Sequence, residues 1–211
     1  MIYIYGDSHA NASFKNLKLV YKNCYENSIT MFRIGRDNTI INFKKDEIRN
    51  KDDVIVLSYG EVDCRCHIQK QIDNGRKEDD IIHELVRKYC ETLRNNIVTN
   101  NKIILVGVIP PTKQCDYEAI HGPILHEFPF VGKDADRVRY TNKVNEQLQE
   151  LAKTHNYIYF NPYSYYTRDD GTLKFELSDT TGHLRDNTYF LEQFYECYRS
   201  VCKTDEHVIH P

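Results

Sequence analysis

Residues 1–10 read MIYIYGDSHA, in which a short apolar run is followed directly by Gly-Asp-Ser-His. The apolar run predicts a buried strand, and Gly, Asp and Ser are common where a chain turns. A serine on a tight turn between a strand and a helix exposes its hydroxyl at the carboxyl edge of a sheet, where open α/β sheets build their sites. Ser8 is therefore a candidate nucleophile, although a surface turn or a helix cap would use the same residue types.

Five apolar runs predict strands: Ile2–Tyr5, Ile29–Ile34, Val54–Tyr59, Ile103–Ile109 and Tyr157–Phe160. They are nearly continuous rather than alternating, which is typical of parallel strands buried on both faces. Helical spacing of apolar residues predicts helices between and after them: Ala10–Tyr21, Asp79–Asn95, Asp134–His155 and Asn187–Lys203. The alternation predicts an α/β fold, a three-layer α/β/α sandwich around a five-stranded, mainly parallel sheet. We expect one domain over 1–203 and a frayed polar tail over 204–211.

The composition is that of an ordinary globular domain. Lys and Arg number 28 against 31 Asp and Glu, so the charge of −3 gives no reason to expect nucleic acid as a partner. No apolar run approaches the length of a membrane span, and the N-terminus lacks the basic region of a secretory signal. Seven scattered cysteines, an odd number, favour free thiols in a reducing compartment. We therefore expect a cytoplasmic protein with no membrane partner, and the oligomeric state stays open.

Two predicted loops are longer than the connections of an α/β/α sandwich require. Asp63–Glu78 follows the third predicted strand and Pro110–Lys133 follows the fourth, so both leave carboxyl ends of strands. Loops of this length in compact domains are usually functional or disordered. The aromatic and proline content of Pro110–Lys133 favours an ordered loop, which we interpret as a lid or a wall of a substrate site.

Four polar clusters are expected to meet at the carboxyl edge of this sheet. They are GDSH at 6–9, IGRDN at 34–38, YGEVDCRCH at 59–67 and SDTTGHLRDN at 178–187. Acyl transfer needs such a set, because it requires a hydroxyl nucleophile, an imidazole base, an orienting carboxylate and N–H donors for the oxyanion.

In these segments the chain resembles the SGNH/GDSL-type hydrolases. That family carries Gly-Asp-Ser after its first strand, a glycine after its second, Gly-x-Asn-Asp after its third and Asp-x-x-His before its last helix. The resemblance implies Ser8 as nucleophile, His183 as base and Asp179 as orienting acid. It also implies oxyanion or substrate-binding positions at Gly35, Gly60 and Asp63. Arg65, two residues after that segment, is a further candidate, because its side chain could reach into the site and bind an anion or an oxyanion.

The chain departs from that pattern twice. Val62 stands where the family has Asn, whose side chain donates to the oxyanion, and losing one such donor typically costs on the order of 10²–10³ in rate. Arg65 or a backbone N–H could substitute for it. Asp179 precedes His183 by four residues instead of three, and Asp186 is an alternative orienting acid.

Several of these residues also have plain structural interpretations. Gly35 and Gly60 could be ordinary turn glycines, and a loop carboxylate such as Asp63 can simply tie loops together by accepting backbone N–H bonds. Cys64-Arg65-Cys66-His67 lacks the spacing of a zinc site, so we expect no metal and no cofactor.

The sequence predicts a serine-dependent hydrolase of O-acyl esters that forms an acyl-enzyme on Ser8. The substrate is expected to be a small-molecule or glycan ester, because Tyr, His and Phe in the long loops suit sugar rings. Two alternatives stay open. One is an O-acyltransferase that passes the acyl group to a sugar hydroxyl, and the other is a non-catalytic carbohydrate-binding protein on the same scaffold.

Overall fold

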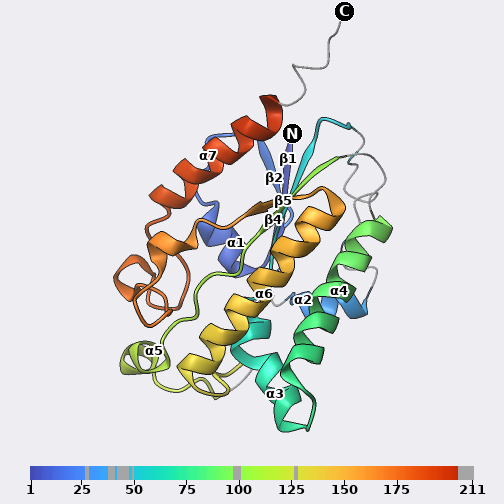
Figure 1. Cartoon of the computed structure of the whole chain (residues 1–211). Coiled ribbons are helices and arrows are strands. Elements are labelled where there is room, and N and C mark those ends of the chain that lie inside the picture. Colours follow the sequence, from blue (N-terminus) through green and yellow to red (C-terminus); the bar gives the residue numbers. More distant parts are fainter. Residues whose placement is uncertain are drawn as a thin grey trace, which may run out of the picture.

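The computed structural model describes residues 1–26, 29–37, 41, 48, 50–96, 101–125 and 128–203. Its centre is a five-stranded, wholly parallel sheet in the order β2-β1-β3-β4-β5 (Figure 1). The strands are β1 (Ile2–Gly6), β2 (Tyr21–Asn23), β3 (Val54–Ser58), β4 (Lys102–Val106) and β5 (Ile158–Phe160). The sheet confirms the predicted fold class.

Helices cover both faces of this sheet. They are α1 (Ser8–Ser13), α2 (Met31–Arg36), α3 (Ile68–Asp73), α4 (Glu78–Asn96), α5 (Gln114–His121), α6 (Asp134–His155) and α7 (Thr188–Lys203). A π-helical turn, η1 (Asp63–His67), leads into α3, and two 3₁₀ turns, η2 (Tyr163–Tyr166) and η3 (Phe175–Leu177), lie between β5 and α7.

Alternate residues of the central strands point into two separate cores. Tyr3, Ile55 and Leu105 belong to the core that contains residues of α2, α4 and α6. Ile4, Val56 and Val106 belong to the core that contains Phe14 and residues of α7. Side chains on successive residues of a strand point to opposite faces, so a strand buried on both faces must be apolar throughout. This is why β1 and β3 read as continuous apolar runs.

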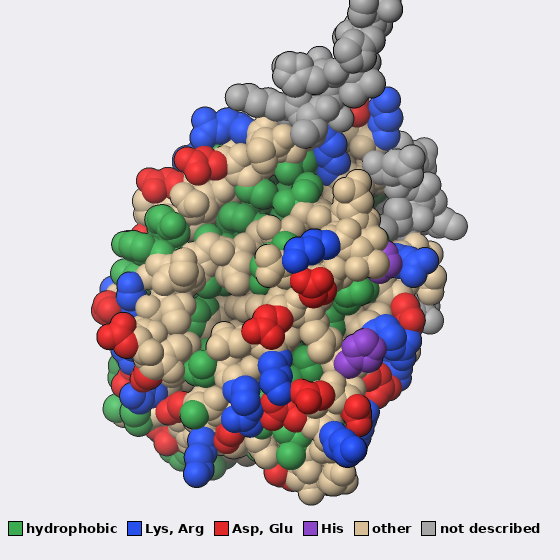
Figure 2. All heavy atoms as spheres, viewed as in Figure 1, with side chains coloured by type: hydrophobic (Ala, Val, Ile, Leu, Met, Phe, Trp, Pro, Cys, Tyr) green, Lys and Arg blue, Asp and Glu red, His purple; other side chains and the backbone are tan. Residues whose placement is uncertain are grey.

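The outer face of α4 and α6 carries interspersed acidic and basic side chains (Figure 2). Glu78 accepts from Arg139 at 3.0 Å and from Lys143 at 2.8 Å, which joins the two helices across their exposed sides. This pairing agrees with the nearly balanced charge of the sequence. In the described residues, no helix is both long enough and apolar enough to cross a membrane.

The predicted strand Ile29–Ile34 is wrong, because this segment forms helix α2. Thr30 caps the helix by accepting the N–H of Arg33, and buried Met31 and Ile34 lie three residues apart on its inner side. A short apolar run cannot distinguish a strand from a buried helix. The actual second strand, Tyr21–Asn23, is a half-buried to exposed edge strand and so has no apolar run to reveal it.

The first helix and the two long loops also differ from the predictions. The first helix ends at Ser13 rather than at Tyr21, since the chain must turn to deliver the edge strand β2. The predicted loop Asp63–Glu78 contains η1 and α3, and Pro110–Lys133 contains α5. The predicted tail 204–211 lies outside the described residues.

Candidate active site

The turn that carries Ser8 is fixed by close packing. A Cβ on Gly6 would lie 2.1 Å from the Ala10 Cβ and 2.8 Å from the Ser58 carbonyl oxygen, so only glycine allows α1 to begin this close to β3. Asp7 caps α1 by accepting the backbone N–H of His9 at 2.9 Å. Ser8 is the first residue of α1 and is only partly buried, as the sequence predicts for an accessible hydroxyl.

A tight hairpin carries His183. Ser178 and Leu184 form an isolated antiparallel bridge, and the N–H of Asp179 donates to the His183 carbonyl at 2.9 Å. Thr180 and Gly182 both take positive φ, 71° and 100°, which closes the loop between them. The additional residue between Asp179 and His183 is therefore accommodated within the hairpin, without separating the two side chains.

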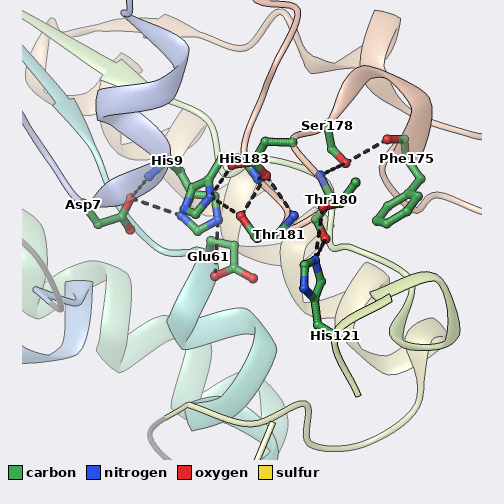
Figure 3. A network of polar contacts seen from close by, with 10 residues as sticks. Asp7, His9, Glu61, His121, Phe175, Ser178, Thr180, Thr181 and His183 are labelled. Atoms are coloured by element: carbon green, nitrogen blue, oxygen red, sulfur yellow. Dashed lines mark hydrogen bonds and ion pairs between the residues drawn. The ribbon is translucent and has the colours of Figure 1, made fainter. Parts of the chain in front are cut away.

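The contacts of His183 select one tautomer. Its Nδ1 lies 3.2 Å from Asp179 Oδ2 and 2.8 Å from Thr181 Oγ1 (Figure 3). The Thr181 hydroxyl donates to Asp179 Oδ1 at 2.8 Å, so it can only accept from the imidazole. Nδ1 therefore carries the proton, and Nε2 has a free lone pair. Nε2 is buried and has no hydrogen-bond partner among the described residues, which is the state a general base needs.

Asp179, rather than Asp186, is the acid beside the imidazole. Asp179 also accepts the backbone N–H groups of Thr181 and His183, so its carboxylate organises the whole hairpin. Asp186 instead accepts the N–H of Thr188, the first residue of α7. The structure thereby decides between the two carboxylates that the sequence left open.

Two cavities meet at Ser8 and His183, since both residues line each of them. The larger cavity, about 580 Å³, also includes Lys15, Asn23 and Arg185 in its lining. The smaller cavity, about 220 Å³, is lined by His9, Glu61, Arg65, Thr112, Tyr117, Ile124, Phe130 and Thr181 as well. Four of these residues come from the Pro110–Lys133 segment, which therefore forms a wall of the site as predicted.

The lining of the smaller cavity includes a charged cluster. His9 Nδ1 is 3.3 Å from Asp7 Oδ1, and His9 Nε2 is 3.6 Å from Glu61 Oε2. Glu61 also accepts from Arg65 Nε at 2.9 Å. Burial opposes the charged form of His9, but Glu61 and Asp7 outweigh it and raise the pKa of this imidazole.

His183 is shifted in the opposite direction. Burial lowers its pKa, and the neighbouring His9 lowers it further, while Asp179 and Glu61 act against both. The rings of His9 and His183 are in contact, with centroids 4.5 Å apart. A lowered pKa keeps His183 neutral and able to accept a proton below the usual histidine range.

Arg65 is the predicted oxyanion or substrate-binding residue that lines the cavity. Its Nη1 donates to the Phe128 carbonyl at 2.9 Å and its guanidinium lies over the Phe130 ring. Its Nη2 makes no hydrogen bond to any residue that the structure describes. Val62, which replaces the expected Asn, is a buried apolar residue and donates nothing from its side chain.

The other three predicted positions lie elsewhere. Gly35 is inside helix α2, packed against Lys88 and Tyr89, and lines a different pocket, because the segment predicted as a strand is a helix. Gly60 takes a φ of 121° after β3, with its Cα facing Val108 and Met31. It lines neither cavity beside Ser8.

Asp63 has the loop-tying role that its structural interpretation predicts. Its carboxylate, which is almost fully buried, accepts the N–H groups of Met31 and Phe32 at the start of α2. It also lies 3.2 Å from Nδ1 of His67. Asp63 therefore holds α2 against η1 and does not line the cavity.

Sequence reasoning missed Glu61 and Thr181 as site residues. Glu61 is the variable position of the Gly-x-Asn-Asp pattern, and Thr181 lies inside the irregular Asp179–His183 spacing. The available signal was their place in the sequence, because each lies within one of the polar segments expected at the carboxyl edge of the sheet. Within the described residues, no group of three or more His, Cys, Asp or Glu side chains could hold a metal ion. Cys64 is buried, and burial raises the pKa of its thiol.

No family model matches the sequence, and no curated protein sequence matches it. Solved structures do match. A proposed platelet activating factor from Streptococcus pneumonia aligns over 93% of this chain and 82% of its own, at 15% identity and a TM-score of 0.65. A proposed acylhydrolase from Bacteroides fragilis aligns over 96% and 86%, at 16% identity and a TM-score of 0.59.

A GDSL-like lipase from Bacteroides thetaiotaomicron aligns over 95% of this chain and 88% of its own, at 13% identity and a TM-score of 0.58. The chain has the α/β fold of the GDSL-type hydrolases. At this level of identity the likeness establishes the fold alone. Ser8 lies in the turn after β1 and His183 in the hairpin before α7, the two places where the sequence analysis expected them.

Proposed function

We propose that this protein is a serine-dependent hydrolase of O-acyl esters, with Ser8, His183 and Asp179 as its catalytic residues. One observation carries the proposal: Ser8 and His183 line the same two cavities, and His183 presents a buried, unpartnered Nε2 while its Nδ1 is held by Asp179 and Thr181. The GDSL-type fold supports it.

In the proposed reaction, Ser8 Oγ attacks the ester carbonyl while Nε2 of His183 accepts the hydroxyl proton. Asp179 and Thr181 hold the imidazole ring, and the Asp179 carboxylate stabilises the imidazolium. His183 then gives its proton to the leaving alcohol, and a water activated by the same base releases the acid from the acyl-enzyme.

Two N–H donors are available for the oxyanion. Ser8 is the first residue of α1, so its backbone N–H has no acceptor within the helix. Arg65 Nη2 is the second proposed donor, and it takes the place of the Asn that Val62 replaces. A hydrogen bond from a cationic donor in a partly closed cavity becomes stronger as negative charge develops on the oxygen. Arg65 in place of the Asn side chain can therefore preserve much of the stabilisation of the oxyanion.

The acyl group is proposed to come from an O-acylated sugar. The smaller cavity combines the rings of Tyr117 and Phe130 with the polar side chains of Thr112, Glu61 and Arg65. Aromatic faces with paired polar groups suit a sugar ring better than a long acyl chain, which would need a wholly apolar channel. No disulfide joins the seven cysteines, all of which lie in the part of the chain that the structure describes. We propose a reducing, intracellular location, which agrees with this.

Acyl transfer to a sugar hydroxyl is a second candidate. The larger cavity on the other side of Ser8 and His183 could hold an acceptor while the smaller one holds the acyl-enzyme. Adding free sugars to the reaction separates the two activities, because a transferase would yield acylated sugar while a hydrolase would yield only free acid.

The test is hydrolysis of short-chain aryl esters and of acetylated sugars by the wild type and by Ser8→Ala. Intact-protein mass spectrometry after treatment with an organophosphonate follows. We expect label on Ser8 and a loss of at least about 10³-fold in kcat/KM for the variant. Equally low rates of hydrolysis for the wild type and Ser8→Ala, with no label on Ser8, would overturn the enzyme proposal. Sugar binding by the wild type and by Ser8→Ala would then favour a carbohydrate-binding role.

A further inference from the structure

Two histidines, rather than one, lie beside Ser8, and their rings are 4.5 Å apart at an angle of 38°. We propose that His9 is held as an imidazolium between Asp7 and Glu61, and that its fixed charge keeps His183 neutral and ready to accept the Ser8 proton. His9 is thus a positioning residue that acts through His183. The catalytic consequence rests on the proposed function, whereas the two protonation states do not.

The geometry of His9 favours two ring protons, because each ring nitrogen faces a carboxylate. Nδ1 faces the Asp7 carboxylate at 3.3 Å and Nε2 faces the Glu61 carboxylate at 3.6 Å (Figure 3). A neutral imidazole has one N–H and would turn a lone pair toward one of these carboxylates, whereas an imidazolium donates toward both. The His9 side chain is only 10% exposed, and the side chains of Asp7 and Glu61 are 4% and 9% exposed. Carboxylates buried to this degree need a cationic partner.

The charges around His9 balance when it is protonated. Asp7 faces it from the turn after β1, Glu61 from the turn after β3, and Arg65 contributes a positive charge from η1. His183 faces it from the hairpin. Tyr59 and Tyr163 line a small cavity with His9, and burial raises the pKa of both phenols, so they stay neutral. Two carboxylates are therefore matched by two cations, and a neutral His9 would leave one buried negative charge uncompensated.

The positive charge of His9 opposes the effect of Asp179 on the protonation of His183. A carboxylate on Nδ1 by itself favours the protonated form of His183 and would block Nε2 at mildly acidic pH. The positive charge of His9, in ring contact with His183, counteracts that tendency. His183 can then be fixed in orientation by Asp179 and Thr181 without being protonated before the substrate arrives.

The test is an NMR titration of the histidine side chains in the intact protein, with signals assigned through His9→Gln and His183→Asn. In the wild type we expect His9 to titrate above the usual value of about 6.5 and His183 below it. In His9→Gln a cation next to His183 is lost, so protonation of His183 becomes easier and its pKa rises. His155→Gln, a distant histidine, is the matched control and leaves the His183 pKa unchanged.

A second variant checks the counter-charge, because Glu61→Gln removes a carboxylate from His9 and should lower the His9 pKa. With an ester substrate, the acid limb of kcat/KM, normalised to each variant's own plateau, should move to higher pH in His9→Gln by the same amount as the His183 pKa. A merely structural role for His9 would lower kcat without moving this limb.

The proposal is overturned if His9 titrates below about 6.5 in the wild type, or if the His183 pKa stays the same in His9→Gln. If His9→Gln does not fold, the His9 ring signals are assigned in the wild type through their bonds to the backbone, and the wild-type titration still decides the first point. If no ester is hydrolysed, the titrations still report both pKa values, so failure of the proposed function is distinguished from failure of this inference.

Discussion

The turn that carries Ser8 and the hairpin that carries His183 are held in different ways. The turn lies between buried strands, and Gly6 packs directly on Ala10 and the Ser58 carbonyl. The hairpin is half-exposed and is held by polar contacts, most of them to Asp179, whose side chain is 40% exposed. Packing therefore sets the place of the nucleophile, whereas hydrogen bonds set the orientation of the base. Damage to the turn should reduce stability, and damage to the hairpin should reduce activity.

The largest expected effect is that of Asp179→Asn on activity. The amide can no longer hold the Nδ1–H tautomer, so kcat should fall by about 10²–10⁴. Because this side chain is well exposed, the unfolding midpoint should change little. Steady-state kinetics and thermal denaturation measure the two quantities.

Asp186→Ala is the matched control for this variant. Asp186 accepts the N–H of Thr188 at the start of α7, so its loss should cost about 0.5–1 kcal/mol of stability and leave kcat nearly unchanged. If Asp186→Ala lost as much activity as Asp179→Asn, the assignment of the orienting acid would be wrong.

The second expected effect is on folding. Gly6→Ala adds a methyl group 2.1 Å from the Ala10 Cβ, and such overpacking should lower the free energy of unfolding by about 1–3 kcal/mol. Denaturant unfolding measures it. In the double variant Gly6→Ala/Ala10→Gly the contact with the Ala10 Cβ is removed, while the contact with the Ser58 carbonyl oxygen remains. The double variant should therefore be more stable than the sum of the two single changes predicts. Full stability in the single variant would contradict the packing argument.

A smaller effect is expected for Thr181→Val. The valine is similar in shape but cannot accept from His183 Nδ1 or donate to Asp179, so two hydrogen bonds are lost and kcat should fall about tenfold. Thr181→Ser keeps the hydroxyl and should retain most of the activity. A loss of equal size in both variants would indicate that the methyl group, rather than the hydroxyl, is important.

The smallest effect is expected for His121→Ala. His121, at the end of α5, contacts the Thr180 carbonyl and hydroxyl oxygens at 3.1 Å, which joins the cavity wall to the hairpin. Its loss should change kcat/KM by about two- to threefold, with a normal unfolding midpoint. An effect as large as that of Asp179→Asn would show that the conformation of the hairpin depends on its contact with α5.

Prediction from sequence succeeded where residues interact locally or where burial imposes a pattern. The strand that precedes Ser8, the long helix Asp134–His155 and the wall formed by Pro110–Lys133 follow from apolar runs, helical spacing and loop length. It failed at Ile29–Ile34 because a buried helix of six residues and a strand have the same apolar composition. That error also misplaced Gly35, which the pattern positioned after a strand that does not exist.

The site was predicted in the same uneven way. Ser8, Asp179 and His183 were named from motifs and Arg65 from its charge and place after the third segment, and the structure brings them to one region. Glu61 and Thr181 were missed because each occupies a position that the motif treats as variable. His9 directly follows Ser8, but its pairing with Glu61 could not be predicted, since 52 residues separate them and no local pattern links them.

The sequence by itself determined the α/β class, the apolar central strands and the candidate nucleophile, base and acid, because side-chain periodicity and turn chemistry are local properties. Only the tertiary structure decided that a polar edge strand replaces the predicted second strand, that Asp179 rather than Asp186 contacts His183, and that His9 lies between two buried carboxylates. These outcomes depend on distances and burial between segments remote in the chain, and a linear sequence does not encode them locally.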